Sequence, residues 1–314
     1  MSQTGLLTRS PVGNHDVTLD PEFYAKHGHA FHGNRLEDPT QCLEIVTGSA
    51  PSVVLLQHEA MTIRLTRADG PNTVFKVFGS PFSQFQGNWA FGYESNDAAA
   101  LWDKIPLDTD IIVTHTPPRS HCDQKANAQS VGCDALYQSM SRIRPPLAVC
   151  GHVHEGRGYD RVRWRTALIG TGLDADGVEY VTRGILPPLG SKKQSLVDLT
   201  GKRGECLENR GFSHAVPGSH GTSATGPIPE TSAGSSAGAA AEQGSRPCSS
   251  APALGADSHA PGHDLHSLRR ETCIINAAIV ASSWPHRGGK RFNTPIVVDL
   301  MLPVRQDVYA SPLE

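Results

Sequence analysis

Two stretches of the sequence place histidines directly after an apolar run. DIIVTH, residues 110–115, ends in His115, and LAVCGHVH, residues 147–154, ends with His152 and His154. Imidazole nitrogens are common ligands of divalent zinc, manganese and iron. A lone histidine is more often a hydrogen-bonded core residue or a surface residue, but three imidazoles gathered at one place favour a metal site.

The apolar runs before these histidines are typical of buried strands in a parallel sheet. In an open α/β sheet, ligands bind beyond the carboxyl ends of the strands, so His115, His152 and His154 are expected at one edge. The turn at residues 155–156 would let both histidines of the second run face one cavity. The histidine-rich stretch HGHAFH, residues 27–32, is expected in a polar loop after a helix and is assigned no role.

Strands and helices are expected to alternate around these two runs. Asp20 can cap a helix that starts at Pro21 and ends near Gly28. Further helices are expected within residues 95–106 and 132–145. Further strands are expected within residues 53–57, 61–66, 73–79, 272–282 and 294–300. A turn at Asp69-Gly70 would join the second and third of these strands as an antiparallel hairpin.

The composition indicates that part of the chain lies outside a core. Hydrophobic residues make up 38% of the 314 residues, below the roughly 45 to 50% of an ordinary globular domain. No Phe, Tyr or Trp occurs between Phe212 and Trp284, so that stretch cannot bury enough apolar surface to offset its ordering entropy. Residues 188–268 are predicted to be a disordered insertion between two parts of one domain, 12–187 and 269–303.

Charge and cysteine content exclude several classes of protein. The 28 Lys and Arg nearly balance the 31 Asp and Glu, so charge predicts neither a nucleic-acid nor a membrane partner. No apolar run approaches the roughly 18 residues of a transmembrane helix, and the start of the chain lacks signal-peptide features. Seven cysteines without a C-x-x-C pair fit reduced thiols. The chain is therefore expected to be cytoplasmic.

Four segments, in chain order, resemble the calcineurin-like metallophosphoesterases, and most closely the branch of small metallophosphoesterase-domain proteins. They are GNHD (13–16), VFGSP (77–81), VTHTPP (113–118) and GHVHEG (151–156). The likeness covers about residues 12–165 and resumes near 272–300. It implies an α/β fold, an incomplete four-layer αββα sandwich here, and a hydrolase that uses two divalent ions such as Mn, Fe or Zn.

The resemblance also implies which residues bind the metals. Asn14 would be an amide-oxygen ligand of the second metal, together with His115 and His152. His154 would belong to the first metal. The family's D-x-H and G-D-x-x-D motifs precede GNHD and supply most ligands of the first metal, yet residues 1–12 contain no Asp and no His. Two close cations repel strongly without anions between them, so this chain is expected to bind two ions weakly, or a single ion.

Other roles implied by the resemblance concern the substrate. His15 would protonate the leaving alkoxide, and Asp16 would hold its ring. By itself, GNHD would more often be an Asx-type turn with a surface histidine. Trp89 could wall the substrate pocket with Phe91 and Tyr93, although such aromatic residues are more often packing. Arg119 could meet phosphate, and an exposed, solvated arginine is an equal alternative.

The predicted function is hydrolysis of phosphomonoesters or phosphodiesters, cyclic nucleotides included, so the expected partner is a phosphate-ester small molecule. The chain is expected to be amino-terminally shortened and impaired, with residues 1–11 and 304–314 outside the family pattern. The alternative is a non-catalytic metal-binding or scaffolding protein descended from the same family. The missing motifs favour this alternative.

Overall fold

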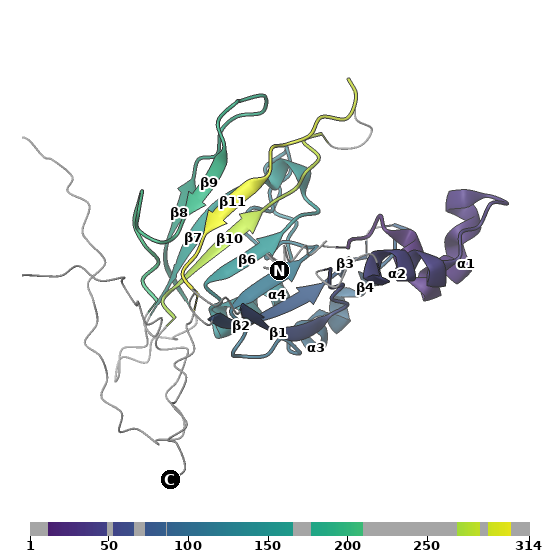
Figure 1. Ribbon diagram of the computed structural model, residues 1–314, viewed down its shortest axis with the longest axis horizontal. Helices are drawn as coiled ribbons and strands as arrows, with labels where there is room; N and C mark the ends of the chain where they lie inside the picture. Colours follow the sequence, from purple (N-terminus) through teal and green to yellow (C-terminus); the bar gives the residue numbers. More distant parts are fainter. Residues whose placement is uncertain are drawn as a thin grey trace, which may run out of the picture.

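The computed structural model describes residues 12–48, 53–65, 73–85, 87–165, 177–209, 269–282 and 288–302. They form a mixed α/β fold around a seven-stranded sheet in the order β1-β2-β5-β6-β10-β7-β8 (Figure 1). The strands of this sheet are β1 (Glu59–Leu65), β2 (Thr73–Ser80), β5 (Ile111–Thr114), β6 (Leu147–Cys150), β7 (Gly158–Trp164), β8 (Val178–Gly184) and β10 (Glu271–Asn276).

The centre of the sheet is parallel and its margins are antiparallel. β2, β5, β6 and β10 run in one direction, whereas β1, β7 and β8 each run against their inner neighbour. Every residue of β10 is buried, as expected for a strand covered on both faces. The carboxyl ends of β5, β6 and β10 therefore meet at one edge, and this edge carries the candidate site.

Helices cover one face of the sheet. They are α3 (Ala98–Trp102) and α4 (Asp134–Ile143), preceded by the short turn η2 (Ser95–Asp97). The fully buried side chains of Trp102, Leu136 and Met140 pack with Ile112 and Ile274 of the sheet. Burying a large apolar side chain contributes about 1.5 to 3 kcal/mol each, so this core fixes the strand ends on which the site is built.

A second sheet covers the opposite face. It consists of β9 (Ser195–Asp198) and β11 (Ile296–Asp299), which pair in parallel. Val197 and Leu199 pack with Leu147, Cys273 and Ile275 of the large sheet. The described residues thus supply a helical layer and two sheet layers of the predicted sandwich.

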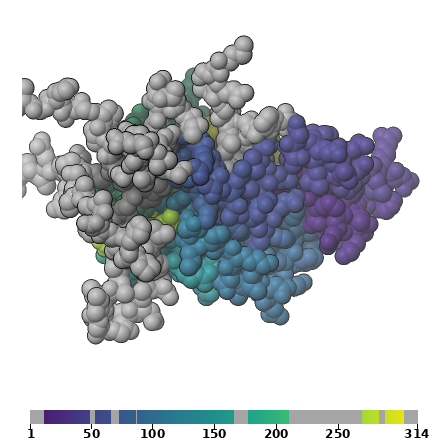
Figure 2. All heavy atoms as spheres, turned by 60° about the horizontal axis from the view of Figure 1, so that its bottom comes forward, coloured from purple at the N-terminus to yellow at the C-terminus, as the bar shows by residue number. Residues whose placement is uncertain are grey.

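The amino-terminal helices form one end of the described part of the molecule (Figure 1 and Figure 2). They are α1 (Pro21–His32) and α2 (Pro39–Gly48), after the turn η1 (Val17–Leu19). As predicted, Asp20 caps α1, because its Oδ1 accepts a hydrogen bond from Phe23 N–H at 3.0 Å. Its Oδ2 accepts from Phe91 N–H at 2.9 Å, which ties α1 to the loop between β3 (Ser83–Gln84) and β4 (Gly92–Tyr93).

Two sequence predictions in the first 60 residues are wrong. Helix α1 does not end at Gly28 but continues to His32, and it is followed by Gly33, whose φ of 58° suits a residue without a side chain. The stretch HGHAFH therefore lies in the helix and not in a loop. Residues 53–57 form no strand among the described elements, because Leu56 packs its side chain over Gly79 of β2 instead of joining the ladder. The hairpin of β1 and β2 is confirmed, and its turn lies outside the described residues.

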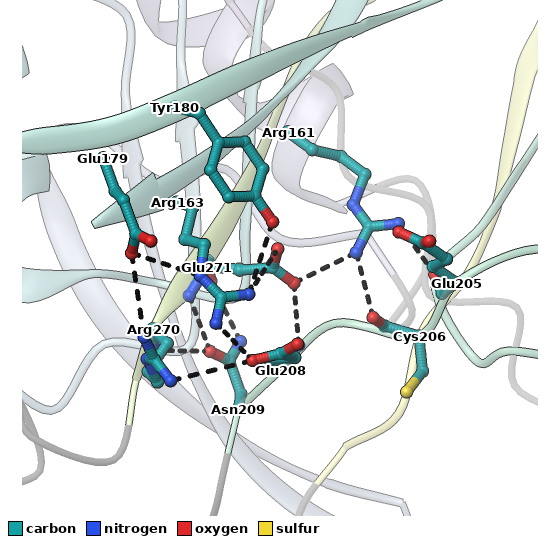
Figure 3. A network of polar contacts seen from close by, with 10 residues as sticks. All are labelled: Arg161, Arg163, Glu179, Tyr180, Glu205, Cys206, Glu208, Asn209, Arg270 and Glu271. Atoms are coloured by element: carbon teal, nitrogen blue, oxygen red, sulfur yellow. Dashed lines mark hydrogen bonds and ion pairs between the residues drawn. The ribbon is translucent and has the colours of Figure 1, made fainter. Parts of the chain in front are cut away.

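Part of the stretch predicted as a disordered insertion is described. Residues 188–209 are described and include β9, and only residues 210–268 of the predicted stretch lie outside the described part. Asn209 and Arg269, which flank that segment, pair in an antiparallel bridge. The Asn209 side chain accepts from the N–H of Glu271 at 2.9 Å and donates to its carbonyl at 2.9 Å (Figure 3). The two ends of the segment are therefore held side by side.

A buried contact between His121 and Asp160 fastens the loop after β5 to the sheet. Asp160 on β7 is fully buried, accepts from Arg183 Nε at 3.0 Å and lies 3.4 Å from His121 Nδ1. Burial alone raises the pKa of Asp160, but its bonds to His121 and Arg183 lower it below the ordinary value. The loop that follows His115 is held in this way beside the carboxyl edge.

The described cysteines are all free thiols, as predicted. No helix in the described part of the chain is long and apolar enough to cross a membrane.

Candidate metal centre

Three of the predicted ligands meet at the carboxyl edge of the sheet. His115 Nε2 lies 2.7 Å from Asn14 Oδ1 and 3.0 Å from His152 Nδ1. The two imidazole rings meet edge to face, with centroids 4.8 Å apart. These three side chains come from three loops that are distant in sequence, and only the parallel order of β5 and β6 brings their histidines together.

The GNHD stretch is a tight turn and not the end of a strand. Asp16 N–H donates to Gly13 O at 2.9 Å, and the Asp16 carboxylate accepts from Gly13 N–H at 2.8 Å. This turn directs the buried Asn14 inward and leaves His15 and Asp16 exposed. A Cβ at Gly13 would lie 2.3 Å from the His115 ring, so the glycine lets the backbone approach that ring.

The loop after β6 has an uncommon backbone at its first histidine. His152 adopts φ 62°, in the left-handed region that L-residues rarely occupy and that histidine tolerates better than most. Val153 N–H donates to Gly151 O at 2.6 Å, and Gly151 N–H donates to His115 O at 3.1 Å. The two histidine loops are therefore bonded to each other through the backbone as well as placed side by side.

The spacing of these donor atoms fits a small divalent ion. With metal–ligand bonds of about 2.1 Å, adjacent ligands are roughly 3.0 Å apart at octahedral angles and roughly 3.4 Å at tetrahedral ones. Of the observed separations, 3.0 Å equals the octahedral value and 2.7 Å is about 0.3 Å shorter, so the first pair would open slightly around an ion. Asn14, His115 and His152 could thus hold one ion through an amide oxygen and two ring nitrogens.

Electrostatics favour the neutral form of both rings. Burial, together with the neighbouring histidines His15 and His154, lowers the pKa of His115 to about 3 and that of His152 to about 4. A histidine must be deprotonated to bind a metal, so both rings are in the binding form at neutral pH. The same three donors carry no negative charge. Among the described residues, no group of three or more His, Cys, Asp or Glu is arranged to hold a metal.

His154 lies close to this cluster but is bonded elsewhere. Its Nδ1 lies 3.0 Å from the carbonyl of Ser282, and it begins the short turn η3 (His154–Gly156). Its charge is near enough to lower the pKa of His115 and His152. The two histidines of GHVH thus point to different partners, the first to His115 and the second to the chain after β10.

Exposed His15 rests on an aromatic side chain. Its ring centroid lies 4.0 Å from that of Trp89, and Trp89 in turn lies 5.4 Å from Phe31 of α1. The neighbouring aromatic residues predicted with Trp89 are core residues instead. Phe91 and Tyr93 are both buried in hydrophobic clusters, so the packing alternative holds for them.

Arg119 is engaged away from the three ligands. Its Nη1 lies 3.6 Å from Asp134 Oδ2 at the start of α4, and both side chains are largely exposed. This is the exposed alternative considered for this residue. An exposed pair of this kind contributes about 0 to 1 kcal/mol, so it leaves Arg119 free to exchange partners.

Sequence reasoning missed one polar residue of this edge. Asn276 is fully buried and ends β10 beside the GHVH loop, to which its side chain donates. A signal was present, because IINAAIV places an amide directly after an apolar strand, as DIIVTH places His115 after β5.

Comparison with known proteins supplies the context for this cluster. No family model matches the sequence. Over 153 residues, 47% of the chain, it is 31% identical to human metallophosphoesterase domain-containing protein 1, of which it covers 44%. A UPF0046 protein of Caenorhabditis elegans is 31% identical over 148 residues, 45% of its length. The matched part of this chain is similar in sequence to part of a metallophosphoesterase-domain protein.

The chain spans less than half the length of these two relatives. It is also 36% identical over 155 residues to probable rhamnogalacturonate lyase C of Emericella nidulans, but this match covers only 13% of that protein. The similarity therefore supports a phosphoesterase role in general terms, and the activity of the whole protein is proposed below.

Proposed function

We propose that this chain is a metal-dependent phosphoesterase that hydrolyses phosphomonoesters or phosphodiesters, cyclic nucleotides included. The observation that carries the proposal is the convergence of Asn14, His115 and His152 with donor atoms 2.7 and 3.0 Å apart. The relatives named for a metallophosphoesterase domain support the same chemistry. Manganese, iron and zinc all accept this donor set.

Each side chain has a distinct task in this proposal. A divalent ion would supply polarisation of a phosphoryl oxygen. Asn14, His115 and His152 would hold it with neutral donors. His15, exposed beside them and supported by Trp89, would bind the phosphate and give a proton to the departing alkoxide. Asp16 would keep the His15 ring oriented, and His154 would contribute to the other ion, the first metal of the pair.

The alternative function is metal binding without catalysis. It is favoured by the absence of a carboxylate from the donors that the described residues bring together. Two divalent ions about 4 Å apart repel each other by about 4 kcal/mol per pair of unit charges, even at an effective dielectric constant of 20. A site with neutral donors alone holds one ion more readily than two.

The test is hydrolysis of bis(4-nitrophenyl) phosphate and 4-nitrophenyl phosphate by the full chain, with manganese, iron or zinc added and the bound metal counted by mass spectrometry. We expect slow turnover that EDTA abolishes and that His115→Ala loses together with bound metal. His29→Ala is the matched control, because His29 lies on α1 and, within the described part of the chain, its ring bonds to Gly33 O at the end of its own helix. Bound metal without turnover would select the non-catalytic alternative. A chain that binds no metal and shows no turnover would refute both functions.

A further inference from the structure

Asn276 gathers carbonyl groups from two loops of the candidate metal centre. Its amide donates to Val153 O at 2.8 Å, to Cys122 O at 2.9 Å and, at a longer 3.3 Å, to Gly151 O. Its Oδ1 accepts from Ala278 N–H at 3.0 Å. Both ends of a fully buried side chain are thus used, and all its partners are backbone groups.

Two of these carbonyls flank His152. Gly151 and Val153 are its chain neighbours, so the Asn276 amide holds the 151–152 peptide directly before this histidine and the 153–154 peptide one residue after it. The left-handed φ of His152 costs on the order of 1 to 3 kcal/mol unless its surroundings impose it. Gly151 O and Val153 O would keep the backbone donors Val153 N–H and Gly156 N–H. Removing the amide would still take away the bond that holds these two carbonyls in place, and leaving a buried carbonyl such as Cys122 O unsatisfied costs about 1 to 3 kcal/mol. The GHVH loop would then relax toward an ordinary backbone conformation.

The contacts of Gly156 show how closely the GHVH loop packs against Asn276. A Cβ at this position would lie 2.2 Å from Cys122 O and 3.0 Å from Asn276 Nδ2. A carbon atom cannot approach a carbonyl oxygen to 2.2 Å, so the loop reaches this amide only because residue 156 has no side chain. The fit between Gly156 and Asn276 provides a second, independent way to disturb the arrangement.

We propose that Asn276 is a positioning residue for the metal centre, which holds His152 so that its Nδ1 meets His115 Nε2. The proposal rests on the proposed function insofar as it takes His152 as a ligand. Asn276 is not itself a ligand in this proposal, because its amide group is bonded to backbone groups. It acts by fixing the backbone of a ligand. At other metal sites, loss of a residue that hydrogen-bonds to a ligand weakens metal affinity roughly 10- to 100-fold.

The experiment compares Asn276→Ala and Gly156→Ala with Thr272→Val in the full chain. Thr272 is a matched control because it is fully buried on the same strand, β10, and accepts from Trp164 Nε1 at 2.8 Å, away from the site. Cobalt(II) is titrated as the probe, and its visible absorption reports coordination. The imidazole ¹⁵N–¹H correlations of His152 and His115 are recorded without metal, and the thermal midpoint is measured for each variant.

The expected result is a cobalt affinity 10- to 100-fold weaker in Asn276→Ala and Gly156→Ala, with an altered absorption spectrum and shifted His152 imidazole signals. Thr272→Val should lower the thermal midpoint while cobalt affinity stays at the wild-type value. The proposal is overturned if Asn276→Ala and Gly156→Ala lose stability only, with wild-type His152 signals and cobalt spectrum. If the wild-type chain binds no metal, the proposed function fails, and the metal-free His152 signals still decide the role of Asn276.

Discussion

The substitution Gly13→Ala tests the candidate centre with a single methyl group. The new Cβ would lie 2.3 Å from Cε1 and Nδ1 of His115, whereas non-bonded carbon atoms need about 3.5 Å. Gly13 is not among the glycines with positive φ, so alanine meets no backbone penalty and the effect is steric. The His115 ring would have to move by at least about 1.2 Å.

That displacement should weaken metal binding strongly and destabilise the fold only moderately. Metal–ligand distances hold within about 0.2 Å, so a shift above 1 Å removes His115 from the ion and from Asn14 Oδ1. A misplacement of 1 Å elsewhere in enzymes can reduce rates about 100-fold, and we expect a loss of metal affinity of at least that order. The free energy of unfolding should fall by about 1 to 3 kcal/mol, as for other overpacked sites.

The assay is isothermal titration of Gly13→Ala with manganese and zinc, at a temperature well below its thermal midpoint. Gly48→Ala is the control, because Gly48 ends α2 and a methyl group there would meet no atom within 4 Å. Unchanged affinity in Gly13→Ala would refute the reasoning, since it would mean that His115 binds no metal or can move aside without cost.

Two further predictions concern the scaffold. Replacing residues 210–268 with a six-residue Gly/Ser linker should preserve metal binding and raise the free energy of unfolding by about 2 kcal/mol. The reason is that Asn209 is already paired with Arg269 and each halving of the loop saves about 0.6 kcal/mol of closure entropy. Denaturant unfolding measures this change, and a chain that no longer folds would contradict the prediction. Because the pKa of Asp160 is lowered in the folded state, its stabilising contribution is present above the ordinary value of 3.8 and lost as the pH falls through the folded value. In Asp160→Asn the free energy of unfolding should therefore fall less steeply as the pH decreases below about 4. An unchanged slope in this acidic range would show that the Asp160 carboxylate is not the group that titrates.

The parts of the fold that follow from local chemistry were predictable. Asp20 before Pro21 marks a helix start, since a capping carboxylate and a proline both act within one turn. The runs before His115 and His152 are apolar because parallel central strands are buried on both faces. Their shared edge then follows from topology alone, and with it the proximity of the two histidines.

The parts that depend on distant contacts were not predictable in the same way. Helix α1 continues past Gly28 because Tyr24 and His32 bond across that glycine, and such packing outweighs the roughly 1 kcal/mol penalty of a helical glycine. The strand β9 is only SLVD, and its partner β11 lies about 100 residues further along the chain. Trp89 could be expected beside the site, but its contact with His15 depends on a loop whose course no local rule specifies.

The candidate centre also depends on a strand that arrives late in the sequence. β6 and β7 are consecutive in the chain, yet β10 lies between them, parallel to one and antiparallel to the other. Without β10, β6 would be an open edge, and the carbonyls on both sides of His152 would lack the Asn276 amide. The ligand geometry is therefore completed only when residues 271–276 enter the sheet. Metal binding and insertion of β10 are thermodynamically linked, so an ion that binds the completed site must also stabilise β10 within the sheet.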